Sequence, residues 1–234
     1  MAESDNLVFT TPPPRSAQPL AFDPVEAVSH LISADRRLAR LIAQAGPFTL
    51  RPEKIQSPFQ ALLRAIIYQQ LSGKAAATIF GRVAAQFPHR RGIQPAAIVA
   101  ANDEALRKAG LSRAKVLAVK DLAAKTLDGT VPTFTRLRKM DDDEIVARLI
   151  GVRGVGRWTV EMLLMFRLGR PDVLPVADLG VRRGFMLTYA KRELPTPAEL
   201  TRHAERWRPF RSVASWYMWR AVDLERRSKL PLPG

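Results

Sequence analysis

Helix-start signals recur along this chain and constrain its fold more than any other feature. The stretches DPVE (23–26), SPFQ (57–60) and TPAE (196–199) each place a capping side chain before a proline at the first helical position. An acid or an amide at the third helical position completes each signal. Hydrophobic residues then recur at helical spacing, and a strand is considered only near residues 47–51. The pattern predicts an all-α protein.

The expected helices cover most of the chain. Asp141 and Glu144 give a further start signal without the proline. Residues 1–20 contain TPPPRSAQP, which has little to bury, and they are expected to form a disordered tail. Helices are expected over residues 24–33, 36–45, 58–71, 73–86, 95–101, 103–109, 113–127, 142–150, 157–168, 178–190, 197–206 and 210–226.

Composition removes several classes of site. The chain contains no cysteine, which excludes disulfides, a thiolate nucleophile, an iron–sulfur cluster and cysteine-bound zinc. The three histidines, His30, His89 and His203, are scattered without metal-ligand spacing. No apolar stretch approaches the ~20 residues that span a bilayer, and no signal peptide is visible. We therefore expect no membrane partner and a cytoplasmic location.

The charge balance indicates a polyanionic partner. Lys and Arg number 37 against 22 Asp and Glu, which gives a formal net charge of +15. An excess this large favours nucleic acid as the partner. The simpler alternative is a basic protein that binds no polyanion. The basic residues do not concentrate on one amphipathic helix, so a membrane surface fits less well.

The stretch LIGVRGVGRWTVEMLLMF (149–166) places glycines between two apolar helical runs. Gly154 and Gly156 lie in the turn between two expected helices, which predicts a helix–hairpin–helix. Because glycine has no Cβ, a phosphate can approach the unpaired N–H groups that begin the second helix. Such binding would be independent of DNA sequence. A dinucleotide-binding loop fits poorly, because its glycine spacing differs and a strand would precede it. An ordinary helix turn with incidental glycines is the remaining alternative.

Asp178 stands where a helix is expected to begin, after the proline-containing stretch RPDVLPVA (170–177). Taken alone, a carboxylate at this position is most simply an N-cap, which accepts backbone N–H groups and stays ionised. It also follows the hairpin by one helix and one loop. This order of hairpin, helix, proline loop and aspartate resembles the helix–hairpin–helix (HhH-GPD) DNA glycosylase superfamily.

Three further stretches resemble 3-methyladenine DNA glycosylase II, the AlkA-like branch, in its short all-helical form. They are IIYQQLSGKAAATI (66–79), LRKAGLSRAKVLAVKDLA (106–123) and AERWRPFRSVASWYMWRA (204–221). The resemblance implies a monomer that acts on double-stranded DNA containing damaged bases and is associated with the nucleoid. It also implies a two-lobed helical fold within residues 21–234, with the active-site cleft between the lobes. The central lobe is expected at about 85–190 with the hairpin at 142–168, and the second lobe at 21–84 and 191–234.

The family reaction is hydrolysis of the N-glycosidic bond of a base, here of alkylated bases of the 3-methyladenine and 7-methylguanine type. It is the first step of base excision repair. The base must first be flipped out of the duplex. The resemblance makes Asp178 the catalytic residue that stabilises the sugar cation and orients water.

Superfamily members that also cut the DNA strand place a lysine just after the hairpin. Trp158 stands here, and an indole cannot form a Schiff base, so no lyase activity is expected.

Aromatic rings favour a positively charged, flat base through stacking and cation–π attraction. By resemblance Trp219 is the stacking residue, and Trp158, Tyr68 and Trp216 are further pocket candidates. Core packing is the alternative for Trp219, and it is the preferred interpretation for Trp207.

The remaining assignments concern DNA and ions. Gln70 is expected to fill the gap left by the flipped base, with Leu71 as second choice. No cofactor is required, but the resemblance implies that Na⁺ or K⁺ could bind the backbone carbonyls of Ile150, Val152 and Gly154. Arg153 stands where relatives often have proline, and it either adds a phosphate contact or loosens the turn. Phosphate contacts are expected from Gly154, Gly156, Arg153, Arg157, Arg182, Arg183 and Arg211.

Two rival functions stay open. The first is a glycosylase for another lesion, such as a deaminated or mismatched base. The second is an HhH DNA-binding module without catalysis. Replacing Asp178 with Asn distinguishes the second, because a binding module would lose nothing.

Overall fold

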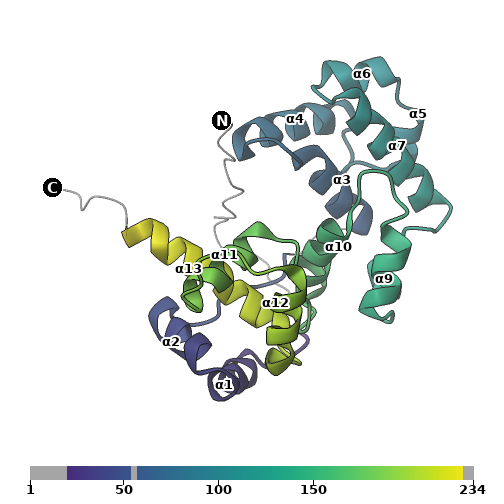
Figure 1. Cartoon of the computed structure of the whole chain (residues 1–234). Coiled ribbons are helices and arrows are strands. Elements are labelled where there is room, and N and C mark those ends of the chain that lie inside the picture. Colours follow the sequence, from purple (N-terminus) through teal and green to yellow (C-terminus); the bar gives the residue numbers. More distant parts are fainter. Residues whose placement is uncertain (1–19, 54–56, 229–234) are drawn as a thin grey trace. The chain divides into compact units, whose positions relative to one another are not determined.

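The computed structural model describes residues 20–53 and 57–228, which form helices joined by turns (Figure 1). The predicted tail lies outside these residues, except for Leu20. Residues 47–51 form no strand, and Glu53 is an isolated bridge residue. None of the described helices has the length and apolar character needed to cross a bilayer.

The helices are α1 (Pro24–Ala34), α2 (Arg36–Ala45), α3 (Pro58–Tyr68), α4 (Gly73–Gln86), α5 (Pro95–Ala100), α6 (Asp103–Lys108), α7 (Arg113–Leu127), α8 (Phe134–Leu137), α9 (Asp142–Leu149), α10 (Arg157–Leu163), α11 (Leu179–Thr188), α12 (Pro197–Ala204) and α13 (Arg211–Ser228), with a π-helical segment at Leu164–Leu168 and a 3-10 turn at Glu205–Trp207.

Side-chain caps begin the helices where the start signals predict them, which confirms the all-α prediction. The carboxylate of Asp23 accepts a backbone N–H of α1 at 2.8 Å, and the hydroxyl of Ser57 accepts one of α3 at 3.3 Å. Thr196 and Glu199 form a reciprocal capping box at α12. Asp141 precedes α9 without a side-chain cap hydrogen bond.

Three local features differ from the prediction. Helix α3 ends at Tyr68 rather than at residue 71, because Gln70 has a left-handed φ of 58°. The helix predicted over 157–168 is α-helical only to Leu163 and then becomes π-helical. Helix α8 was not expected, because four residues are too few to show helical periodicity.

The described residues divide into two compact units, Glu53–Leu163 and a second unit made of 20–52 with 164–228. The predicted lobe boundaries near residues 85 and 190 differ from these. Helices α3 and α4 belong to the first unit, because α3 packs against both α4 and α7. Helix α11 belongs to the second unit, because it packs along α13.

Helix α7 is central to the first unit and contacts α3, α5 and α6 (Figure 1). Its residues Val119 and Leu122 are fully buried, as are Leu63 and Ile67 of α3. Helices α9 and α10 pack against each other, and α10 also packs against α3. The first unit therefore connects the hairpin helices to α7 through one core.

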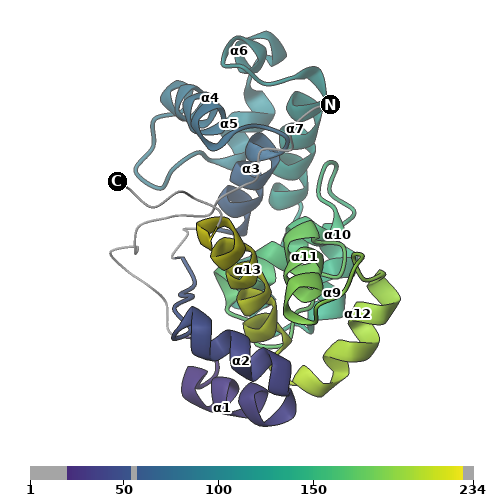
Figure 2. The same ribbon diagram turned by 60° about the vertical axis from the view of Figure 1, so that its left-hand side comes forward.

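Helices α11 and α13 lie side by side in the second unit, and α13 also contacts α2 (Figure 2). A Cβ at Gly184 of α11 would lie 1.9 Å from the carbonyl oxygen of Met218 on α13. Only glycine therefore permits this close approach of the two backbones.

A buried polar cluster joins α2 to the C-terminal part of the second unit. Oδ2 of Asp35 accepts the Tyr189 hydroxyl at 2.6 Å and the Trp207 indole N–H at 3.2 Å, and Nε2 of His203 lies 2.9 Å from it. Burial alone would raise the pKa of Asp35, but the hydrogen bonds from His203, Tyr189, Trp207 and the Leu38 N–H hold it below its ordinary value. The same carboxylate caps α2.

Candidate active site and DNA-binding hairpin

Asp178 is the N-cap of α11, as its position predicts. Its Oδ1 accepts the Val181 N–H at 2.8 Å and the indole Nε1–H of Trp219 at 2.9 Å. The side chain is partly exposed rather than enclosed in the core. A carboxylate held by two donors and still accessible to solvent can stabilise a developing positive charge.

Phe166 and Gly180 support this pair, and neither was predicted as a site residue. The ring of Phe166 stacks on Trp219 with centroids 5.6 Å apart and planes at 27°. A Cβ at Gly180 would lie 2.7 Å from Cδ1 of Trp219 and 3.1 Å from Oδ1 of Asp178. The glycine two residues after Asp178 was a readable signal, whereas Phe166 depends on the π-helical segment that presents it.

The other predicted pocket rings have different surroundings. Trp216 is buried in the core of the second unit, edge-on to Phe48 at 5.1 Å, which argues against a role as a pocket wall. Tyr68 is half-buried at the end of α3, beneath the guanidinium of Arg64 at 4.9 Å. Trp158 is half-exposed in the first turn of α10. The pocket roles of Tyr68 and Trp158 stay predictions.

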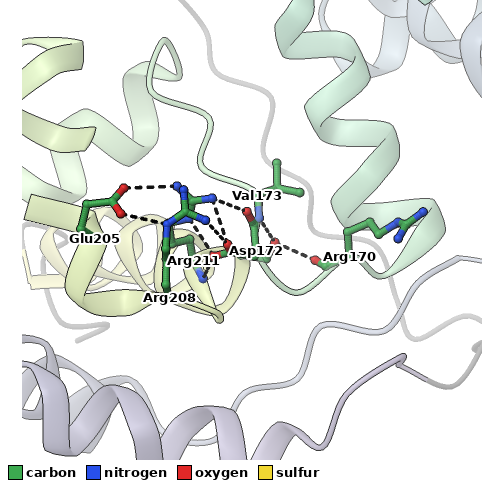
Figure 3. Close-up of polar contacts among 7 residues, drawn as sticks. Arg170, Asp172, Val173, Glu205, Arg208 and Arg211 are labelled. Carbon is green, nitrogen blue, oxygen red and sulfur yellow. Dashed lines mark hydrogen bonds and ion pairs between the residues drawn. The ribbon is translucent and has the colours of Figure 1, made fainter. Parts of the chain in front are cut away.

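The loop before Asp178 is attached to the start of α13 (Figure 3). Oδ1 of Asp172 accepts Nε of Arg211 at 2.7 Å, and Oδ2 accepts Nη2 of Arg211 at 3.0 Å and Nη1 of Arg208 at 2.7 Å. The Ser212 hydroxyl donates to the Arg170 carbonyl and accepts the Val173 N–H. These contacts fix the segment that leads into Asp178.

The same contacts argue against the phosphate role predicted for Arg211. Its side chain is only 13% exposed, and its guanidinium is bound in a bidentate manner to Asp172. The basic residue was readable from the sequence, but its acidic partner 39 positions away was not. We therefore assign Arg211 to positioning the loop.

The predicted hairpin is present between α9 and α10. Gly154 has a left-handed φ of 78°, and the Val155 N–H donates to the Val152 carbonyl at 3.0 Å to close the turn. Helical bonding in α10 starts when the Val160 N–H donates to the Gly156 carbonyl at 3.2 Å. The first N–H groups of a helix lie outside its ladder of backbone hydrogen bonds, and here they follow directly on the glycine turn.

Helix α7 contacts the hairpin turn through Asp121 and Lys125. The Arg153 N–H donates to Oδ2 of Asp121 at 2.7 Å, and Nζ of Lys125 contacts the same oxygen at 2.8 Å. Nζ of Lys125 also donates to the Gly151 carbonyl at 2.5 Å. Burial alone would raise the pKa of Asp121, but these donors lower it. Helix α7 therefore holds the turn through Asp121 and Lys125, and the effect of the Arg153 side chain stays a prediction.

The loop predicted to carry the wedge residue also contacts the hairpin. Nε2 of Gln69 donates to the Gly154 carbonyl at 2.9 Å. Nζ of Lys115 donates to the Ile67 and Gln69 carbonyls at 2.7 and 2.8 Å. Gln70 is exposed and Leu71 is half-buried, so Gln70 stays the preferred wedge.

The remaining predicted phosphate contacts fall into two groups. Arg153 and Arg157 are exposed beside the turn, and Arg157 lies 3.8 Å from Glu161. Arg182 is partly exposed and donates to the Pro195 carbonyl at 2.9 Å, and Arg183 pairs with Glu225 at 2.8 Å. The first pair is the more available to a ligand.

Comparisons with known proteins agree with this architecture. Residues 63–209 match the HhH-GPD superfamily of base excision DNA repair proteins. DNA-3-methyladenine glycosylase 1 of Schizosaccharomyces pombe is 35% identical over 207 residues, which cover 85% of this chain and 88% of that protein. A structure of the 3-methyladenine DNA glycosylase of that organism with abasic DNA has a TM-score of 0.74 and 34% identity, covering 83% of this chain and 95% of that chain. A DNA-3-methyladenine glycosidase from Bacillus halodurans has a TM-score of 0.78 and 34% identity, covering 86% and 91%. The chain belongs to the HhH-GPD superfamily of base excision DNA repair proteins.

Proposed function

We propose that this protein is a monofunctional DNA glycosylase that removes alkylated bases from duplex DNA by hydrolysis. The observation that carries the proposal is the partly exposed Asp178 carboxylate, held against the Trp219 indole. The similarity to proteins named DNA-3-methyladenine glycosylase supports the choice of substrate class.

The chemistry requires little from the protein beyond charge and position. A base inside a duplex is out of reach, so the damaged nucleotide is flipped into the site. Cleavage of the base–sugar bond leaves positive charge on the deoxyribose, and the Asp178 carboxylate stabilises that charge electrostatically. Water then adds to the sugar cation and gives up a proton, which yields the free base and an abasic site. The exposed hairpin turn binds the DNA backbone without regard to sequence.

The aromatic pair accounts for a preference for alkylated purines. A methylated purine such as 3-methyladenine carries positive charge on a flat ring, and an indole face attracts such a ring by about 0.5–2 kcal/mol. Phe166 stacks on Trp219 and restricts how its indole can tilt. These bases are also good leaving groups, so no separate general acid is required.

The absence of strand cleavage is part of the proposal. Strand cleavage by this superfamily uses an amine that attacks the sugar to form a Schiff base. Trp158 occupies the position just after the hairpin turn, and it offers no amine.

The test uses methylated duplex DNA. The protein should release 3-methyladenine and 7-methylguanine, identified by mass, and strand breaks should appear only after alkali. Asp178→Asn keeps a good N-cap but loses the charge. It should lose at least about 100-fold in the rate of base release and keep its DNA affinity.

Other outcomes would redirect the proposal. Release of uracil or of mismatched bases instead would identify another lesion class. Binding without release of any base would identify a DNA-binding module. Strand breaks before alkali treatment would contradict the argument from Trp158.

A further inference from the structure

We propose that the ammonium group of Lys125 takes the place of a Na⁺ or K⁺ ion at the hairpin turn, so that DNA binding by this protein needs no particular monovalent cation. The inference rests on the proposed DNA-binding role of the hairpin. It makes Lys125 and Asp121 positioning residues for the turn.

The geometry places the Lys125 ammonium group against the turn. Nζ of Lys125 donates to the Gly151 carbonyl at 2.5 Å and to Oδ2 of Asp121 at 2.8 Å. Its side chain is 28% exposed, so the ammonium contacts these oxygens and solvent together. An ammonium that binds a backbone carbonyl and a carboxylate provides the attraction that a bound alkali ion would provide.

Two of the three carbonyls expected to bind an ion already accept a hydrogen bond. The Val152 carbonyl already accepts the Val155 N–H at 3.0 Å, and the Gly154 carbonyl accepts Nε2 of Gln69 at 2.9 Å. The concavity that these carbonyls line is also lined by Lys125 and Asp121. A second cation there would be repelled by the ammonium, and Asp121 supplies only one negative charge for both.

Arg153 fits this arrangement better than proline would. Its backbone N–H donates to Oδ2 of Asp121 at 2.7 Å, and proline has no N–H to donate. A residue other than proline at position 153 is therefore needed for the backbone contact with Asp121, the carboxylate that also binds Lys125. These contacts hold the turn in one conformation before a phosphate reaches it.

The experiment compares DNA affinity in different salts. Binding of a duplex that contains a tetrahydrofuran abasic analogue is followed by fluorescence anisotropy in KCl, NaCl or tetramethylammonium chloride at one concentration. The tetramethylammonium ion is too large to bind among backbone carbonyls. The wild-type protein should give the same Kd in all three salts, within about twofold.

Two variants at position 125 complete the test. Lys125→Met should bind about tenfold more weakly in tetramethylammonium chloride, since it loses a charged hydrogen bond, and should regain affinity in KCl or NaCl. Lys125→Arg keeps the charge and should stay independent of the cation. Lys120→Met, on the same helix but paired with Asp103, is the matched control and should behave as wild type. Circular dichroism and thermal melting verify that each variant is folded.

The inference is overturned if wild-type binding weakens in tetramethylammonium chloride, or if Lys125→Met binds as tightly as wild type in every salt. The proposed function fails separately, because it is measured by base release from methylated DNA. A wild-type protein that binds no DNA in any salt overturns both.

Discussion

The indole N–H of Trp219 donates to Oδ1 of Asp178 at 2.9 Å, and the Val181 N–H donates to the same oxygen at 2.8 Å. Two donors on one oxygen restrict rotation of the carboxylate, so its orientation is set before any DNA binds. The bond also joins α13 to the N-terminus of α11. The predicted catalytic residue is therefore positioned partly by the residue predicted to stack on the base.

Trp219→Phe tests this relationship, because it removes the N–H and keeps an aromatic ring against Phe166. We expect kcat for base release to fall about tenfold with a smaller change in KM, since the substitution removes one hydrogen bond to a charged group. Single-turnover kinetics on methylated duplex DNA measure both. In an Asp178→Asn background, Trp219→Phe should cause little further loss of kcat. An equal loss of kcat in both backgrounds would show that the indole hydrogen bond does not act through Asp178.

Gly180→Ala should displace Trp219 from Asp178. The new Cβ would lie 2.7 Å from Cδ1 of the indole, and α11 and α13 are packed too closely to separate freely. We expect a loss of base release of about tenfold or more, with little change in helix content by circular dichroism. Gly81→Ala is the matched control, because nothing lies within 4 Å of its Cβ position on α4. It should leave activity unchanged and stabilise the helix by about 0.5–1 kcal/mol.

Asp35→Asn should destabilise the protein in a pH-dependent way. At pH 7 we expect a loss of about 3 kcal/mol in the free energy of unfolding, because the buried donors around Asp35 lose their charged acceptor. The folded state holds the pKa of Asp35 below the reference value of 3.8, so its contribution is present above that pH and is lost as the pH falls. Urea unfolding should show that the difference in the free energy of unfolding between wild type and variant is smaller at pH 3 than at pH 7.

The control for this prediction is Asp23→Asn, at a cap without such a cluster. It should change stability by less than about 1 kcal/mol, because asparagine is also a good N-cap. If the difference in unfolding free energy between wild type and Asp35→Asn stays constant or grows towards pH 3, the proposed link between stability and the pKa of Asp35 is wrong.

Arg211 and Arg153 should differ in the salt dependence of DNA binding. A phosphate contact adds about one to the slope of log Kobs against log salt concentration. Arg153→Met should reduce the slope, because Arg153 is exposed beside the turn. Arg211→Met should leave the slope unchanged and lower the melting temperature, since it releases the Asp172 loop. A reduced slope for Arg211→Met would restore its predicted phosphate role.

The helices, the hairpin and the N-cap at Asp178 could be predicted from the sequence because they depend on neighbours within a few residues. A capping side chain, a proline at the first helical position and a glycine with left-handed φ act locally. Hydrophobic spacing then gives the extent of each helix. The family could be recognised for the same reason, since its signature is an order of such local elements.

Tertiary structure alone decided which side chains contact the hairpin turn and the segment around Asp178. Trp216 and Trp219 lie three positions apart, yet one packs into the core and the other bonds to Asp178. Lys125 reaches Gly151 across 26 positions, and Arg211 reaches Asp172 across 39. Contacts at such separations depend on how helices pack, and hydrophobic periodicity fixes the buried face of a helix without naming its partner. The sequence by itself therefore determined the local elements, and packing determined the contacts that position the candidate site.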